Sequence, residues 1–317
     1  MIVPHLPAQE KDSGLVWPMP PDKPRIKFLQ TISSLEKFQP KKGFFAKILS
    51  FITGGERPSQ WLVQPVGIAI APDGRIIIAD PGANCLHVLN LKEGEYDAIT
   101  ETKYGKFISP VGLAFASDGT LYVSDSQRGD VISFDHDLNA HGEFKGPLHR
   151  PAGILIEHDT LYVVDVGGHD ISMFDRSGTF LGSFGHRGTE DGEFNYPVQL
   201  AANNSLYVVD GLNYRIQKFD FGWNHTLTFG SQGTVAGKFS SPKGIALDSD
   251  SDIYVTDALM DNFQIFNPAG QLLLVVGRKG VGDGEFMSPG GITIDASDKI
   301  YIVETLNKRI QIFQYLK

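Results

Sequence analysis

The sequence has very little cysteine and no long apolar run, and each absence excludes a class of protein. Cys85 is the only cysteine in the 317 residues, which excludes an internal disulfide framework and any site built from several thiolates. No stretch of about 18 consecutive apolar residues occurs, so the sequence predicts no membrane-spanning helix. The N-terminal run MIVPHLPAQEKDSG lacks the basic region and long apolar core of a signal peptide. Either the protein is cytoplasmic or the numbering begins after a removed signal.

Positive charge is also scarce. Lys and Arg number 28 against 37 for Asp and Glu, which gives a net charge of −9 at pH 7. Because an acidic chain gains little from releasing the counterions of a phosphate backbone, we expect no nucleic-acid partner. The chain also has no HExxH zinc motif, no GxSxG elbow, no P-loop and no CxxCH haem site. The sequence therefore predicts no metal, no cofactor and no catalytic residue, which favours a protein that is not an enzyme.

Glycine is abundant, with 35 residues, and it accompanies an internal repeat. Six segments open with proline and recur about every 45 residues, a period typical of propeller blades with four strands each. They begin PVGIAIAPDGRIIIAD at Pro65, PVGLAFASDGTLYVSD at Pro110, PAGILIEHDTLYVVD at Pro151, PVQLAANNSLYVVD at Pro197, PKGIALDSDSDIYVTD at Pro242 and PGGITIDASDKIYIVE at Pro289. The first run of most units has alanine at its middle, as in Ala69 and Ala246, which suits six inner strands crowded round one axis. The pattern predicts an all-β, six-bladed β-propeller over residues 65–317.

Two motifs and a set of glycine-rich links identify the kind of repeat. The motifs are DGLNYRIQKFD at residues 210–220 and ETLNKRIQIF at residues 304–313, and the links are GHRGTEDGEFNYP, GSQGTVAGKFSSP and GRKGVGDGEFMSP. In these features the chain resembles bacterial NHL-repeat proteins, over about residues 60–317. The resemblance implies a six-bladed propeller. It does not fix the function, because propellers of this type include lyases, ubiquitin-ligase targeting modules, RNA readers and scaffolds.

The last repeat lacks its fourth strand. Residues 289–316 supply only three strand-like runs, whereas an orphan run, RIKFLQTIS at residues 25–33, precedes the first repeat. We expect this run to pair with the final strand and close the ring, because closure removes an exposed sheet edge. The expected organisation is a Pro-rich extended arm at residues 1–24, the closing strand at 25–33, a connector at 34–64 and the blades at 65–317.

The connector contains KKGFFAKILSFITGG at residues 41–55, with apolar residues at helical spacing. We expect a short amphipathic helix here that ends at Gly54-Gly55. It would either pack on the propeller rim, or dock on a partner, or touch a membrane surface weakly. Its candidate docking residues are Phe44, Phe45, Ile48 and Leu49.

The repeats also suggest a recognition face. An acidic residue ends the second run of every unit, and we expect these six residues to serve the blade by accepting backbone hydrogen bonds. The position five residues after this acid differs from unit to unit. A residue that differs between units is not required by the fold, so it is a candidate for recognition. Among the residues that follow the six prolines, at the expected channel mouth, only Lys243 is charged. The candidate binding-face residues are Asp130, His169, Asp170, Arg187, Arg215, Lys243, Arg278 and Arg309.

These observations predict a protein-interaction scaffold or binding module, a monomeric propeller that presents one face to a protein partner. The alternative is a propeller lyase or hydrolase with a metal or small ligand in its central channel. The resemblance to bacterial NHL proteins with a Pro-rich leader implies a cell-envelope location, and it suggests an electron-transfer complex as a partner.

Overall fold

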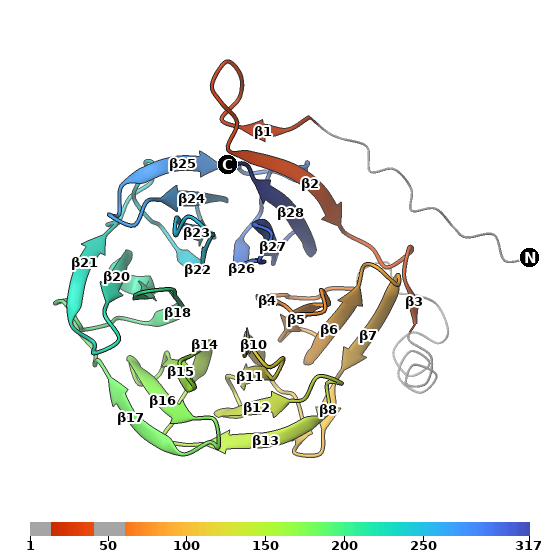
Figure 1. The fold of residues 1–317 in the computed structure, drawn as a ribbon, viewed down its shortest axis with the longest axis vertical. Helices are drawn as coiled ribbons and strands as arrows, with labels where there is room; N and C mark the ends of the chain where they lie inside the picture. The colour runs from red at the N-terminus through yellow and green to blue at the C-terminus, as the bar shows by residue number, and fades with distance from the viewer. Residues whose placement is uncertain (1–13, 41–60) are drawn as a thin grey trace, which may run out of the picture.

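Each repeat forms an antiparallel sheet because runs of Val, Ile and Tyr alternate with tight turns. In blade 2, β10 (Pro110–Phe115), β11 (Leu121–Asp125), β12 (Asp130–Phe134) and β13 (Ala140–Lys145) follow one another from the ring axis outward. We call the strands of a blade a, b, c and d in this order. In the computed structural model, which describes residues 14–40 and 61–317, six such blades surround a central axis (Figure 1). The predicted six-bladed β-propeller is confirmed.

The remaining blades follow the same plan. Blade 1 contains β4 (Gly67–Ile70), β5 (Ile76–Asp80), β6 (Cys85–Asn90) and β7 (Glu95–Ile99). Blade 3 contains β14 (Pro151–Glu157), β15 (Thr160–Asp165), β16 (Asp170–Asp175) and β17 (Phe180–Phe184). Blade 4 contains β18 (Pro197–Ala202), β19 (Leu206–Asp210), the 3-10 turn η1 (Gly211–Asn213), β20 (Arg215–Phe219) and β21 (His225–Phe229). Blade 5 contains β22 (Pro242–Leu247), β23 (Ile253–Asp257), β24 (Asn262–Phe266) and β25 (Leu272–Val276).

Blade 6 is built from both ends of the described chain. Its inner strands are β26 (Pro289–Ile294), β27 (Lys299–Glu304) and β28 (Arg309–Tyr315), and its outer strand is β2 (Ile26–Ile32). Strands β2 and β28 pair antiparallel, with Ile26 opposite Tyr315 and Ile32 opposite Ile310. Ile26 and Phe28 are buried against the aromatic side chains of blades 5 and 6. The predicted closing strand is therefore confirmed, and the pairing covers the edge of β28.

Apolar side chains on the blade faces form the core. The described residues contain a hydrophobic cluster between each pair of neighbouring blades, for example around Phe194 between blades 3 and 4 and around Phe286 between blades 5 and 6. Phe194, Phe239 and Phe286, from the three glycine-rich links, are fully buried. The links therefore supply core residues as well as connections.

Glycine allows the inner strands to meet around the axis. A Cβ atom on Gly67 would lie 2.0 Å from the carbonyl oxygen of Val111, and one on Gly112 would lie 2.0 Å from that of Ala152. Any side chain at these positions would push neighbouring blades apart. The crowding that the sequence predicts at the inner strands is thus greatest at the glycine two residues after the repeat proline.

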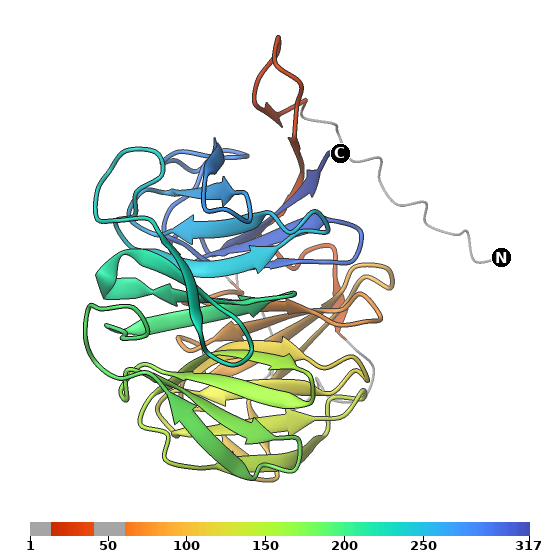
Figure 2. The ribbon, with the colours of Figure 1, turned by 60° about the vertical axis from the view of Figure 1, so that its left-hand side comes forward.

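Short segments outside the blades lie along the rim. Strand β1 (Val16–Trp17) pairs with β2, and Figure 2 shows the hairpin between them projecting from the ring near the C-terminus. Strand β3 (Gln39–Pro40) runs parallel to β7, and a small hairpin, β8 (Glu101–Thr102) and β9 (Gly105–Lys106), joins blades 1 and 2. The expected docking helix with Phe44, Phe45, Ile48 and Leu49 lies outside the described residues, as does the first half of the Pro-rich arm. Across residues 14–40 and 61–317, no helix has the length and apolar content needed to span a bilayer.

Candidate functional site

One face of the ring carries most of the irregular chain. Strand a begins and strand b ends at this face, which also carries the six b–c turns and the links from strand d to the next blade. We call it the link face. All eight candidate binding residues belong to its turns, its links or the strand ends beside them.

A ring of buried carboxylates lies just behind the link face. In blade 2, Asp125 accepts hydrogen bonds from the backbone N–H groups of Ile108 and Ser109 in the link, at 2.7 and 2.9 Å, and of Arg128 in the b–c turn, at 3.1 Å. Each member of the ring is at most 1% exposed, and the full set is Asp80, Asp125, Asp165, Asp210, Asp257 and Glu304. These side chains tie each link to its turn, as expected for a residue that serves the blade.

Hydrogen bonds offset the burial of these carboxylates. Burial alone would raise the pKa of Asp80 and of Asp165. Hydrogen bonds from a histidine and from backbone N–H groups outweigh burial at both sites and hold each pKa below the ordinary Asp value. These hydrogen bonds therefore favour the ionised form of Asp80 and of Asp165.

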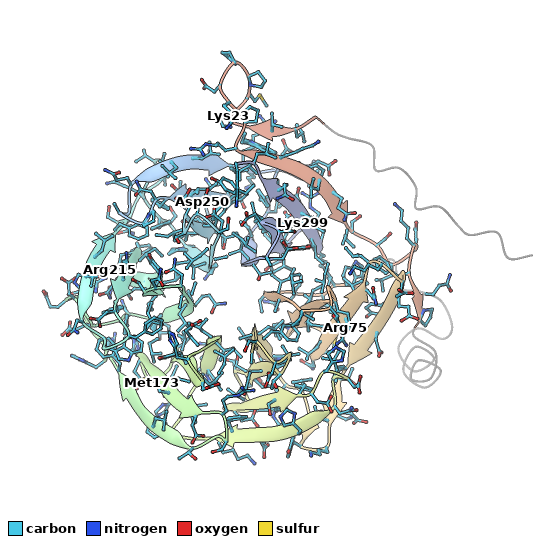
Figure 3. All side chains as sticks on the ribbon, viewed as in Figure 1. Lys23, Arg75, Met173, Arg215, Asp250 and Lys299 are labelled. Carbon is cyan, nitrogen blue, oxygen red and sulfur yellow. The ribbon has the colours of Figure 1, made fainter. Side chains whose placement is uncertain are left out.

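Arg215 and Arg309 hold the glycine-rich links in place. The Arg215 guanidinium lies 2.8 Å from the Asp210 carboxylate and donates to the carbonyl oxygens of Glu190 and Glu193, within blade 4 (Figure 3). Gln217 also donates to the Glu193 carbonyl and accepts from the Gly192 N–H. Arg309 and Gln311 repeat this arrangement in blade 6. Their hydrogen bonds are used within the blade, so these arginines have little to offer a partner.

Asp130 is also occupied. It is 2% exposed, and the Arg128 guanidinium lies 2.7 Å from its carboxylate and 2.9 Å from that of Glu143. Arg128 further donates to the carbonyl oxygens of Tyr104 and Lys106. In blade 2, Arg128 of the b–c turn therefore donates hydrogen bonds to carbonyl oxygens of the link, as the strand-c arginines do in blades 4 and 6. Asp130 stands where blades 4 and 6 have an arginine, and its negative charge is paired with Arg128 of the same blade.

Asp170 in blade 3 has no such arginine. It lies opposite Asp165 across β15 and β16, and burial, followed by the charge of Asp165, raises its pKa above the ordinary Asp value. Its Oδ1 atom is buried and accepts no hydrogen bond from the described residues. The neighbouring His169 accepts the backbone N–H of Tyr196 at Nδ1, at 3.2 Å. This pair therefore lies half-buried at the link face, with an unsatisfied carboxylate oxygen.

The other three candidates are exposed cations. Arg187 and Arg278 lie in links, and Arg278 pairs with Glu285 at 2.9 Å with an 82% exposed side chain. Lys243 follows Pro242 at the start of β22. Of the eight candidates, Lys243 is the one that lines the central cavity.

The cavity opens at the centre of the link face and has a volume of about 880 Å³. All six residues that follow the repeat prolines line it, as the sequence predicts: Val66, Val111, Ala152, Val198, Lys243 and Gly290. Its charged lining residues are Lys243 and Arg150, and neutral polar groups come from glutamine, serine and tyrosine side chains. No Asp, Glu, His or Cys belongs to this lining among the residues that the structure describes.

Three exposed leucines occupy equivalent turn positions on consecutive blades of the link face, and two of them, Leu212 and Leu259, line the cavity. Leu212, Leu259 and Leu306 each lie two residues after the buried acid of their blade, in the b–c turn, and are 48%, 73% and 62% exposed. Blades 1, 2 and 3 have Gly82, Gln127 and Gly167 at this position. We call the three residues the leucine arc. None of the three is among the residues predicted from the sequence, although the turns of the six repeats differ at this position.

A cysteine and a histidine meet in blade 1, away from the cavity. The Cys85 sulfur lies 3.5 Å from His87 Nε2, and His87 Nδ1 lies 2.8 Å from the Tyr96 hydroxyl. Burial, followed by the charge of Asp80, raises the pKa of the Cys85 thiol, so it is not a nucleophile at neutral pH. Within the described ranges, no three His, Cys, Asp or Glu side chains are placed to hold a metal ion together.

Comparison with known proteins identifies the fold of this chain and does not identify an activity. A family model described as a six-bladed β-propeller matches residues 241–315, which span the four strands of blade 5, the link to blade 6 and strands β26 to β28. No curated protein sequence matches the chain. The fold and this match define the class of the protein as a six-bladed β-propeller.

Solved structures with this fold have different functions. The chain is similar to virginiamycin B lyase from Staphylococcus aureus at 17% identity and a TM-score of 0.59, covering 80% of this chain and 96% of that one. It is similar to a gluconolactonase from Xanthomonas campestris at 15% identity and a TM-score of 0.62, covering 80% and 87%. It is also similar to an auxiliary nutrient binding protein from Bacteroides thetaiotaomicron at 14% identity and a TM-score of 0.62, covering 81% and 70%. At these identities the likeness shows the fold alone.

Proposed function

We propose that this propeller is a binding module whose link face holds a segment of a protein partner, with the leucine arc as its apolar contact surface. The observation that carries the proposal is the exposure of Leu212, Leu259 and Leu306 at equivalent positions of three consecutive blades. The b–c turn itself does not require leucine, because Gly82, Gln127 and Gly167 occupy the same position elsewhere. Two of the three leucines, Leu212 and Leu259, line a cavity that also has polar lining residues, and exposed apolar side chains at such a cavity are typical of interaction sites.

Two finer features belong to the same proposal. We assign the repeats to the NHL type, supported by the equivalent Arg215 and Arg309 contacts behind the link face. We also assign the protein to a complex at the cell envelope, where an electron-transfer partner would fit the sequence resemblance. Neither feature is needed for the leucine arc to bind a partner.

A matched set of variants tests the binding role. One variant replaces all three arc leucines with glutamine, the residue that blade 2 has at this position. The control replaces Leu181 and Leu273, which lie on strand d and are 56% and 46% exposed, also with glutamine. Both should keep the circular dichroism spectrum and thermal midpoint of the unmodified protein.

The measurement is selection of binders from a displayed peptide library, followed by dissociation constants from fluorescence anisotropy. We expect peptides that bind the unmodified protein and the control equally, and the arc variant about tenfold more weakly or worse. Selection of no peptide, or of peptides that bind the arc variant equally well, would contradict the proposed function.

A further inference from the structure

The central cavity differs in charge from the rest of the protein. The chain has a net charge of −9, yet the charged residues that line the cavity are the cations Lys243 and Arg150. The carboxylates of the buried ring lie behind this lining and are at most 1% exposed. A ligand entering the cavity therefore meets positive charge and neutral hydrogen-bond donors.

Lys243 is an exception to the repeat. The equivalent residues of the other blades are Val66, Val111, Ala152, Val198 and Gly290, so the fold does not need a cation there. The ammonium group of Lys243 makes no hydrogen bond or ion pair with any described residue. Crowding by protein atoms lowers the pKa of Lys243, although the charge of Asp257 opposes this effect. The exposed side chain of Lys243 therefore lies at the cavity mouth without an ion-pair partner among the described residues, where a bound anion could pair with it.

The other polar groups of the lining suit the same kind of ligand. The side chains of Gln64, Gln127 and Ser241 line the cavity and make no hydrogen bond with other side chains in the described ranges. The Arg150 guanidinium makes no ion pair with any described residue and supplies a second cation. Beside these donors stands the apolar surface of the leucine arc. The site therefore combines one charged and one apolar requirement.

We propose that the central cavity binds a carboxylate of the docked partner segment, with Lys243 as the principal charged contact and the leucine arc holding the apolar residues beside it. This inference rests on the proposed function and adds the chemical class of the bound segment, which is acidic with apolar residues beside the carboxylate. The carboxylate comes from a glutamate or aspartate side chain or from a chain end. A carboxylate can pair with either cation of the lining, Lys243 or Arg150, and a phosphoserine peptide distinguishes it from a phosphate.

Matched peptides test the charge requirement. Four fluorescent pentapeptides share flanking leucines and have glutamate, glutamine, phosphoserine or lysine at the centre, with amidated C-termini. A fifth has glutamine at the centre and a free C-terminal carboxylate. We expect the glutamate peptide or the free-acid peptide to bind the folded protein about tenfold more tightly than the amidated glutamine peptide, and the lysine peptide to bind most weakly. The preference should decline as salt concentration rises.

Substitutions of Lys243, with Lys279 as a control, test whether the preference for a carboxylate peptide comes from the cavity. Lys243→Gln should remove it, Lys243→Arg should retain it, and Lys279→Gln should leave it unchanged, because Lys279 is an exposed cation outside the cavity lining. Equal binding of the carboxylate and amidated glutamine peptides would overturn the proposal, as would a preference that persists in Lys243→Gln. Tighter binding of the phosphoserine peptide than of every carboxylate peptide would also overturn it.

The two proposals fail in different ways. If all peptides bind equally and glutamine in place of the arc leucines abolishes binding, the binding role stands and the carboxylate assignment is wrong. If the carboxylate peptides bind through Lys243 and the arc variant binds them equally well, the assignment of the charge stands and the leucine arc is not the contact surface. If no peptide binds, both proposals are wrong.

Discussion

At the scale of single residues, position in the repeat decides what a charged side chain does. Asp130 and Asp170 occupy the same position in neighbouring blades. Asp130 is held by Arg128 at 2.7 Å, whereas the Oδ1 atom of Asp170 is buried without a donor in the described chain. An unsatisfied buried carboxylate opposes folding when it is ionised.

Replacing Asp170 with asparagine should therefore stabilise the protein at pH 7. The raised pKa of Asp170 means that the folded state binds its proton more tightly than the unfolded state, so the penalty is absent at low pH and appears as pH rises through that pKa. We expect the midpoint of thermal unfolding to increase by about 2 °C at pH 7 and by less at pH 4. Asp137→Asn, at an 85% exposed side chain, should leave the midpoint unchanged at both pH values. A lower midpoint for Asp170→Asn at pH 7 would show that the ionised carboxylate stabilises the fold.

At the scale of elements, the closing strand replaces the missing outer strand of blade 6. Strand β2 buries Ile26, Phe28 and Ile32 against the ring and covers the edge of β28. Without β2, the apolar edge of β28 would be open to another chain.

We expect the full chain to be monomeric and deletion of residues 1–33 to yield soluble oligomers or aggregate. The measurement is size-exclusion chromatography with light scattering, and deletion of residues 1–13, which leaves β1 and β2 in place, is the control. A synthetic peptide of residues 14–33 added during refolding should restore the monomer, because it supplies the same hydrogen bonds and apolar side chains. A deletion variant that stays monomeric and equally stable without the peptide would contradict this role for β2.

The strands and links also show which features of the structure could be predicted from the sequence. Six proline-led units and an orphan strand were enough to predict the blades and the closure, because both follow from hydrophobic alternation and sheet edges. The candidate face was harder to predict. Arg215 and Arg309 are charged residues in turn-like motifs, yet their contacts with link carbonyls are visible only in three dimensions. The leucine arc was missed because apolar residues in a strand-rich chain are first assigned to the core.

At the scale of the whole molecule, stability depends on the ring of buried carboxylates that ties links to turns. An ionised carboxylate accepts hydrogen bonds at both oxygens, whereas protonation turns one oxygen into a donor and weakens the bonds from fixed N–H groups. The lowered pKa values of Asp80 and Asp165 mean that the folded state binds these protons less tightly than the unfolded chain. Their contribution is complete above the ordinary Asp pKa and is lost as pH falls through the lowered values.

The contribution of Asp80 and Asp165 to the free energy of unfolding should therefore be complete from pH 7 down to about pH 4 and decrease as pH falls further. Urea unfolding followed by tryptophan fluorescence at a series of pH values measures this. Asp125→Asn, which removes one of the acceptors at pH 7, should lower the free energy of unfolding there by about 2 kcal/mol. A stability that does not change down to pH 2 would show that the carboxylates contribute little.

The pairing of β2 with β28 also sets the order of events during synthesis. A ribosome makes β2 before, and β28 after, every other strand of the six blades, so β2 lacks its β28 partner while residues 33–309 are produced. At usual rates of translation this interval lasts on the order of tens of seconds. During that time a strand whose apolar residues belong in the core is exposed to solvent, to chaperones and to neighbouring nascent chains. The strand that completes the ring is therefore also the segment through which two newly made copies could exchange strands.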